Sequence, residues 1–196
     1  LAAALALTLP PLTGRVVDQP NIISADARGS IETKLADLEA KSTIQLVVAT
    51  VKSLEGQEIE PYANQLFRTW ALGQKDKNNG ALLIIARDER RLRIEVGYGL
   101  EDRLTDAQSS VIINQVITPA FKTGNFSKGI SDGVAAMLVV LGGNPLDEPS
   151  TAYESRGDPG DDFVSRHPGL LVFLVMLFIL TVFVCQMLGI LPAGRG

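Results

Sequence analysis

The stretch NGALLIIARDERRLRIEVGYGLEDRLTD, residues 79–106, decides the fold of this chain. Residues 80–86 form an apolar run with no polar position, which is typical of a strand buried on both faces. After a short charged turn, residues 91–96 alternate between charged and apolar side chains, which is typical of a strand with one exposed face. The two runs predict an antiparallel hairpin whose second strand is half exposed.

The directions of these two strands decide which loops meet. Because antiparallel strands run in opposite directions, the start of the first and the end of the second lie at the same edge of the sheet. We therefore expect the loop 73–79 to meet the loop 97–106. The polar side chains brought to this edge are Asp76, Asn78, Asn79, Glu101, Asp102 and Asp106. The turn acids Asp88 and Glu89 go to the opposite edge, which leaves the first group as the candidate site.

The residues before the hairpin complete an α/β pattern. Residues 43–51 are rich in β-branched side chains and predict a central strand. Apolar residues at helical spacing over 59–70 predict a helix that packs on the core. A strand, a helix and a returning strand form a βαβ unit, so 43–51 should lie parallel to 80–86 and the sheet should be mixed. Further helices are predicted from Ser24 to about Lys41, from Thr105 onward, and before Gly142-Gly143.

Composition excludes several classes of function. The chain has 196 residues and a formal net charge of −4, with no basic block, which argues against nucleic-acid binding. Its single His, His167, and single Cys, Cys185, lie beside or within an apolar run near the C-terminus. Ser-His-Asp and Cys-His catalysis and zinc sites need these residue types in the domain, so we set them aside. The glycine pair 97 and 99 lacks the third glycine of a dinucleotide-binding fingerprint.

Both ends of the chain differ from its middle. Residues 1–6 are similar to the end of a truncated signal peptide cleaved near Ala6, with a buried N-terminal strand as the alternative. Residues 144–168 are rich in proline, glycine and acids and predict a flexible linker after a domain that spans 12–143. Residues 169–191 carry no charge, and a helix of this length spans roughly 30 Å, enough for a bilayer core. We predict one transmembrane helix there, followed by a short tail, 192–196.

Four motifs are similar in order and spacing to those of a known family. They are Gly14-Arg15-Val16-Val17-Asp18, Asn79-Gly80-Ala81-Leu82-Leu83, the run RIEVGYGLE at 93–101, and Leu104-Thr105-Asp106. In these residues the chain resembles the TPM domain family over about residues 12–143. The run 93–101 is the specific part of the resemblance. Residues 19–21, Gln-Pro-Asn, depart from the small and apolar residues usual in the family and leave the role of that loop open.

The resemblance implies more than the spacing does. It implies a three-layer α/β/α sandwich similar to a Rossmann fold, on a domain that faces the periplasm, the cell exterior or the thylakoid lumen. It also implies an N-terminal signal, a C-terminal membrane helix, a phosphatase label and binding of divalent cations.

The acidic edge has the chemistry of a hard-cation site. Acids that converge with backbone carbonyls suit Ca²⁺ or Mg²⁺. We expect Asp76, Glu101 and Asp106 as oxygen ligands. Asp18 also matches the family and is kept as a fourth candidate, although a parallel strand ending there would place it at the other edge. The structural alternative is that Asp106 only favours a helix N-terminus, that the glycines only make a turn, and that Tyr98 lies over the core.

Two functions from different classes fit these residues. The first is a membrane-tethered binding module with a divalent-cation site, which acts with a protein partner in or near the membrane in assembly or maintenance of membrane complexes. The second is a slow metal-dependent phosphatase for phosphomonoesters, in which Arg93 or Arg103 holds the phosphate. In both, the helix 169–191 anchors the domain outside the cytoplasm, in a bacterial periplasm or at the cell surface.

Overall fold

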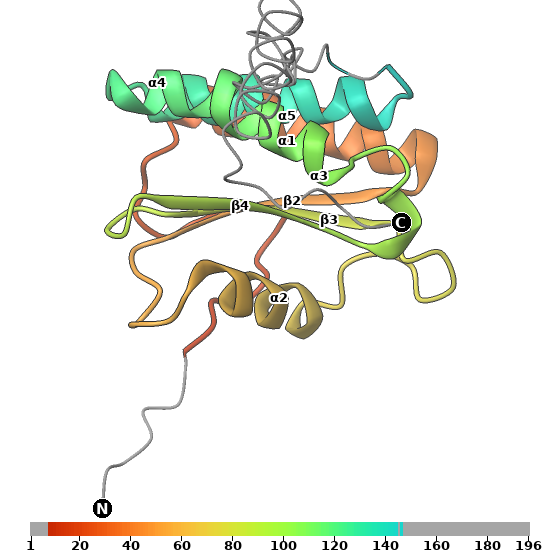
Figure 1. The fold of residues 1–196 in the computed structure, drawn as a ribbon, viewed down its shortest axis with the longest axis horizontal. Helices are drawn as coiled ribbons and strands as arrows, with labels where there is room; N and C mark the ends of the chain where they lie inside the picture. The colour runs from red at the N-terminus through yellow and green to blue at the C-terminus, as the bar shows by residue number, and fades with distance from the viewer. Residues whose placement is uncertain (1–7, 145, 147–196) are drawn as a thin grey trace, which may run out of the picture. The chain divides into compact units, whose positions relative to one another are not determined.

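The computed structural model describes residues 8–144 and 146, and it contains one four-stranded mixed sheet (Figure 1). The strands follow each other in chain order across the sheet: β1 (Val16–Asp18), β2 (Gln45–Val51), β3 (Gly80–Ala86) and β4 (Arg91–Val96). β1, β2 and β3 are parallel, and β4 pairs antiparallel with β3. The predicted α/β fold, the βαβ unit and the hairpin are confirmed.

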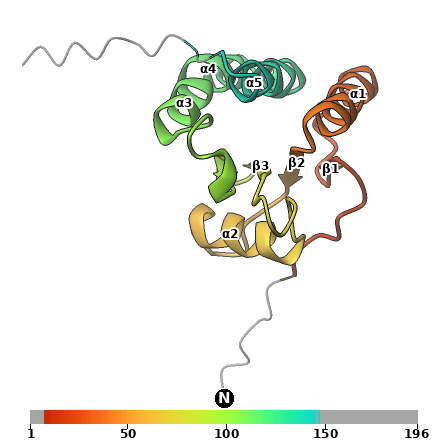
Figure 2. The same ribbon diagram turned by 90° about the vertical axis from the view of Figure 1, so that its right-hand side faces the viewer.

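Helices cover both faces of this sheet (Figures 1 and 2). One face carries α2 (Ile59–Thr69) alone. The other face carries α1 (Ala25–Ser42), α3 (Asp106–Val111), α4 (Thr118–Lys122) and α5 (Phe126–Leu141). The short 3-10 turn η1 (Tyr98–Leu100) follows β4, and η2 (Ile112–Ile117), a π-helical segment, joins α3 to α4. The described part of the chain is therefore layered as helix, sheet and helices.

Alternate residues of the central strands build a separate core on each face. Along β3, Leu82 and Ile84 pack with Tyr62 and Leu66 of α2, whereas Leu83 faces the other helices. All seven residues of β3 are buried, as expected for a strand covered on both faces. Burial of both faces leaves the ends of the strands as the places where polar groups gather.

The register defines these two ends. Gln45, Gly80 and Val96 lie together where the parallel strands begin, and we call this end the amino edge. Asp18 and the β3–β4 turn lie where the parallel strands end, and we call this the carboxyl edge. The acids of the turn, Asp88 and Glu89, are at the carboxyl edge, as predicted.

Contacts on both sides tie the segments before and after the domain to its body. The Trp70 indole N–H donates to the Pro10 carbonyl over 2.9 Å, and Leu9 packs against the α2 core. The Gln108 side chain exchanges hydrogen bonds of 2.8 and 3.1 Å with the backbone of Leu146. The predicted signal remnant 1–6 and the transmembrane helix 169–191 lie outside the described residues, as does nearly all of the linker. Within the described residues, no helix is both long and apolar enough to cross a bilayer.

Candidate functional site

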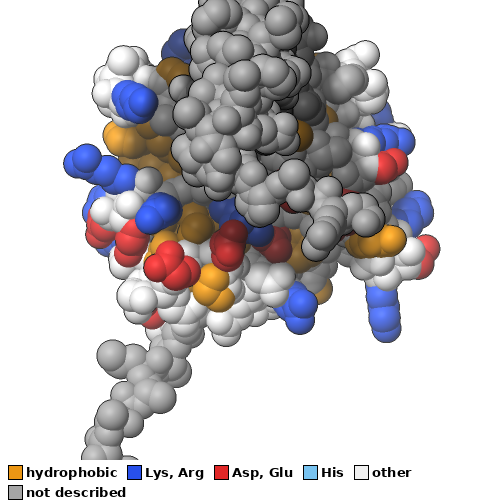
Figure 3. All heavy atoms as spheres, in the orientation of Figure 1, with side chains coloured by type: hydrophobic (Ala, Val, Ile, Leu, Met, Phe, Trp, Pro, Cys, Tyr) orange, Lys and Arg blue, Asp and Glu red, His pale blue; other side chains and the backbone are white. Residues whose placement is uncertain are grey.

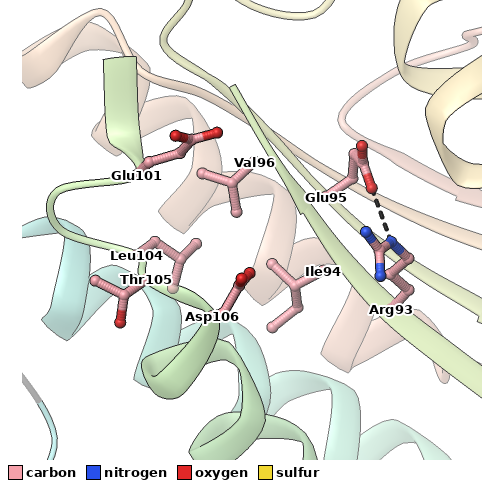
Figure 4. A pocket seen from close by; sticks show the side chains of 8 residues that line it. All are labelled: Arg93, Ile94, Glu95, Val96, Glu101, Leu104, Thr105 and Asp106. Carbon is pink, nitrogen blue, oxygen red and sulfur yellow. Dashed lines mark hydrogen bonds and ion pairs between the residues drawn. The ribbon is translucent and has the colours of Figure 1, made fainter. Parts of the chain in front are cut away.

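A cavity of about 350 Å³ opens at the amino edge beside β4 (Figure 4). Its lining comes from the second half of β4 and from the segment that leads into α3, namely Arg93, Ile94, Glu95, Val96, Glu101, Leu104, Thr105 and Asp106. The floor is apolar, because Ile94 and Leu104 are buried members of the core. Carboxylates stand on its walls.

Two of the four acids considered as ligands face this cavity. Glu101 follows η1, Asp106 begins α3, and both carboxylates point into the same space in Figure 4. In the described residues, neither carboxylate has a hydrogen bond or ion pair to a side chain or backbone group. Thr105 fixes the start of α3, because its hydroxyl accepts the Gln108 N–H over 3.1 Å. The predicted N-cap is thus present, while the adjacent acid stays open to solvent.

The loops at this edge are locked together through their backbones. The Gly99 N–H donates to the Asn78 carbonyl over 3.1 Å, and the Gly97 N–H donates to the Gly80 carbonyl over 2.8 Å. A Cβ on Gly97 would overlap the Asn78 carbonyl oxygen, and one on Gly99 would overlap that of Lys77. These glycines allow a close approach of two chain segments, which the turn interpretation missed.

The buried side chain of Asn79 adds hydrogen bonds that hold the same loops together. Its side-chain NH₂ donates to the Thr43 carbonyl over 2.8 Å, and its oxygen accepts the Gln74 N–H over 2.7 Å. Asn79 is buried, so its polar atoms serve the loops and not a ligand. The Asn-Gly motif at 79–80 has a structural explanation.

Asp76 lies on the loop that packs against this edge but does not line the cavity. Its side chain is exposed. Across residues 8–144 and 146, no three Asp, Glu, His or Cys side chains come close enough together to hold a metal ion. The structure therefore brings together Glu101 and Asp106 and leaves Asp76 apart from them.

Asp18 is at the carboxyl edge, because β1 runs parallel to β2 and Asp18 pairs with Thr50 at its end. Its carboxylate accepts the N–H groups of Ile22 and Ile23 over 3.1 and 2.9 Å, and also the Thr50 hydroxyl. These bonds hold the loop that leads to α1. Asp18 is separated from the other predicted ligands by the length of the sheet.

The two arginines proposed for phosphate binding both have other partners. Arg93 projects to the α2 side of β4, where it pairs with Glu95 over 2.8 Å and with Glu60 over 2.9 Å (Figure 4 shows the first pair). Arg103 donates to the Leu141 carbonyl over 3.1 Å, at the C-terminal end of α5. Such a bond satisfies a helix-terminal carbonyl and complements the helix dipole.

The Tyr98 side chain is in solvent. The structural alternative in which it lies over the core is wrong, because Tyr98 is 81% exposed. It stands between Gly97 and Gly99, whose backbones are pressed against residues 77–78, so its backbone is held in place while its ring is in solvent. Its position between two glycines in a polar loop was the available signal.

These features define a class: an α/β domain with a mixed sheet, an exposed β4 edge and a carboxylate-walled cavity beside it. The model of the TPM domain matches residues 16–140, and the chain belongs to the TPM domain family. The resemblance noted in the sequence is confirmed.

Solved structures agree with this assignment. The N-terminal domain of a protein from P. gingivalis is 34% identical, with a TM-score of 0.63 over 68% of this chain and 85% of that one. The BA42 protein from Bizionia argentinensis is 21% identical and has the same fold, with a TM-score of 0.54 over 63% of this chain and 83% of that one. A chloroplastic UPF0603 protein of Arabidopsis thaliana is 18% identical over 148 residues, 75% of this chain. The chain spans about half of that curated relative, 52% of its length.

Proposed function

We propose that this TPM domain is a binding module that holds a divalent cation in the amino-edge cavity and presents Tyr98 beside it to a protein partner. The observation that carries the proposal is the pair of carboxylates of Glu101 and Asp106, which have no bonded partner among the described residues and line one cavity, with the exposed ring of Tyr98 three residues before Glu101 in the chain. The uncharged segment 169–191 supports a membrane tether and hence a partner in or near the membrane.

The cation part of the proposal rests on donor chemistry. Carboxylate oxygens suit Ca²⁺ or Mg²⁺, and the described residues contribute no His or Cys to this edge. Two carboxylates fill only part of the coordination shell, so water and backbone carbonyls would supply the rest. We therefore expect weak binding, with a Kd of about 10⁻⁴–10⁻³ M, as in other modules with few charged ligands.

The partner part rests on Tyr98. Tyrosine is enriched at the centres of interfaces because a rigid ring buries much area at little entropic cost. Here the backbone on both sides of the ring is already fixed by residues 77–78, so little order has to be gained on binding. A cation at Glu101 would remove the charge repulsion that two adjacent carboxylates present to an acidic partner.

A phosphatase function has weaker support from these residues. Arg93 and Arg103 are each bonded elsewhere, so neither is free to hold a phosphate in the cavity. Binding without catalysis is therefore the function that we propose.

Thermal unfolding of the full chain tests the cation site. A ligand that binds only the folded state stabilises it by RT ln(1 + [L]/Kd), so 10 mM Ca²⁺ should add about 1.4–2.7 kcal/mol for the expected Kd range. Glu101→Gln with Asp106→Asn should abolish the gain, and Asp76→Asn should leave most of it. The control, Asp37→Asn with Glu58→Gln, makes the same change in net charge at exposed positions away from the cavity. Equal loss in the control, or no gain in the parent protein, would refute the site.

Crosslinking from position 98 tests the partner surface. A photoreactive residue in place of Tyr98 should give a discrete protein adduct in membranes, and Glu101→Gln with Asp106→Asn should reduce it. The same residue at Val139, which is exposed on α5, serves as the control position. An identical adduct from position 139 would show that Tyr98 does not mark the contact surface.

A further inference from the structure

A second and larger cavity, of about 590 Å³, lies at the carboxyl edge. It is bounded by the end of β3, the β3–β4 turn, the start of β4 and the α4–α5 region, with Ile22, Ile85, Ala86, Arg87, Arg90, Arg91, Leu92, Thr118, Phe121, Lys122, Gly124 and Phe126 as its lining. Figure 3 shows hydrophobic surface bordered by Lys and Arg side chains at this end of the molecule. None of these residues takes part in the amino-edge site.

The inner wall of this cavity is apolar and partly aromatic. Phe121 and Phe126 pack against each other with ring centroids 5.0 Å apart, and Ile85 and Leu92 close the side toward the sheet. Ligand pockets for small molecules have volumes of roughly 300–1,000 Å³ and mostly apolar walls with a few polar groups. The carboxyl ends of strands are also where open α/β sheets commonly bind ligands.

The rim is cationic, and most of its charge is not neutralised. Within the described residues, Arg90, Arg91 and Lys122 have no ion pair, whereas Arg87 pairs with Asp88 over 2.9 Å. The remaining acid of the turn is also occupied: the Glu89 carboxylate accepts the Ser53 hydroxyl over 2.6 Å and the Leu54 N–H over 2.9 Å. Both acids of the turn are thus engaged in other contacts. They do not neutralise Arg90, Arg91 or Lys122, which surround the apolar cavity.

We propose that this cavity binds a small amphiphilic anion, a molecule with one carboxylate or phosphate on an aromatic or branched apolar body. The apolar body fits the wall of Phe121, Phe126 and Leu92, and the anion meets Arg90, Arg91 and Lys122 at the rim. Inorganic phosphate would use only the rim and leave the apolar wall in water. A bilayer presents many headgroups to a flat face, whereas these cations surround a hollow. The inference is independent of the proposed function.

The test uses 2-naphthoate as the probe and the full chain in a non-ionic detergent, with binding measured by equilibrium dialysis. The parent protein should bind 2-naphthoate saturably and at least tenfold more tightly than the neutral analogue 2-naphthamide. Arg90→Gln with Arg91→Gln should weaken 2-naphthoate binding about tenfold or more and leave 2-naphthamide unchanged. Both arginines are exposed, so the fold should tolerate the change.

Two further arms separate specific binding from its alternatives. Lys34→Gln with Lys41→Gln removes the same charge from α1 and should leave binding intact; an equal loss would overturn the proposal in favour of a general charge effect. Phe121→Leu should weaken both naphthalene ligands. Binding to anionic lipid vesicles without saturable 2-naphthoate binding would overturn the proposal in favour of a lipid surface. No dependence on Arg90 and Arg91 would overturn it outright.

Discussion

Gly99 lies where the loop 97–106 approaches the loop 73–79 most closely at the amino edge. A side chain there would overlap the Lys77 carbonyl oxygen, which belongs to backbone and cannot rotate away. We expect Gly99→Ala to lower the free energy of unfolding by about 2–3 kcal/mol, because the loops must separate. Urea unfolding measures this directly. Gly29→Ala in α1 is the control, since a Cβ there meets nothing within 4 Å, and it should add about 0.5–1 kcal/mol. Equal effects at both glycines would contradict the close approach.

Glu89 should make stability depend on pH in the acidic range. Burial raises the pKa of its carboxyl, and hydrogen bonds from Ser53 and Leu54 lower it by more, so the pKa lies below the ordinary value. A lowered pKa contributes stability that is present above the unfolded-state pKa and is lost as pH falls through the folded-state pKa. The side chain is largely exposed, so we expect Glu89→Gln to cost only about 0.5–1 kcal/mol at pH 7. Unfolding at pH 3 should show a smaller difference, and an unchanged difference would exclude the carboxylate as the cause.

The site was predictable where strand direction alone decided it. The opposite directions of the two hairpin strands were enough to separate Glu101 and Asp106 from Asp88 and Glu89, and a parallel strand ending at Asp18 was enough to place that residue at the far edge. It was not enough for Asp76, because whether a loop side chain faces a cavity depends on backbone packing that no pattern encodes. Nor could it show that Arg93 turns toward Glu60, since that contact joins β4 to a helix distant in sequence. The carboxyl-edge cavity could not be predicted either, because its wall combines β4 with α4 and α5, which are distant from β4 in the sequence.

At the scale of elements, a hydrogen bond from Trp70 joins the end of α2 to the N-terminal segment. The indole of Trp70, at the end of α2, donates to Pro10 over 2.9 Å and is buried. We expect Trp70→Phe to keep most of the packing, remove the donor and cost about 1–1.5 kcal/mol. Amide exchange at residues 8, 9, 12 and 13 should become faster, which NMR measures. Phe67→Leu in the same helix should lower stability without this local release; equal release in both variants would show that packing, not the hydrogen bond, holds the segment.

Elements with strong periodicity were predicted well, and irregular ones were not. β3 was predicted correctly because seven successive apolar residues between turns are typical of a strand buried on both faces. The helix start at Ser24 was also predicted correctly, since its hydroxyl accepts the Ala27 N–H. The π-helical segment η2 was missed. Pro119 follows it and lacks an N–H, and the Thr118 N–H reaches back five residues to Ile113, a register that side-chain period does not reveal.

At the scale of the whole molecule, the position of β1 departs from the usual topology. β1, β2 and β3 are parallel neighbours in chain order, so both crossovers step across the sheet in the same direction. α1 packs on one face and α2 on the other. The two crossovers therefore have opposite hands, although such connections are nearly always right-handed. With only three residues, β1 offers too little pattern for a sequence to overrule that expectation.

This topology also separates two edges of opposite chemistry on one rigid sheet. Among the described residues, the acids Glu101 and Asp106 at the amino-edge cavity and the cations Arg90, Arg91 and Lys122 at the carboxyl-edge cavity have no ion pair. The seven residues of β3 span six steps of 3.3 Å, so the two edges of the sheet are about 20 Å apart. Two unit charges at that distance in water interact by only about 0.2 kcal/mol, before screening over a Debye length of about 8 Å.

Simple electrostatics therefore predicts that the two proposed ligands bind independently. Saturating Ca²⁺ should change the Kd of 2-naphthoate by less than about twofold at 0.15 M salt, because a divalent ion contributes at most about 0.4 kcal/mol over this distance. Titrating the probe with and without Ca²⁺ measures the coupling, and by linkage the reverse titration must give the same factor. A tenfold change would exceed what charge can transmit. It would mean that the sheet or the helices over it take two arrangements, and that the edges act as parts of one switch.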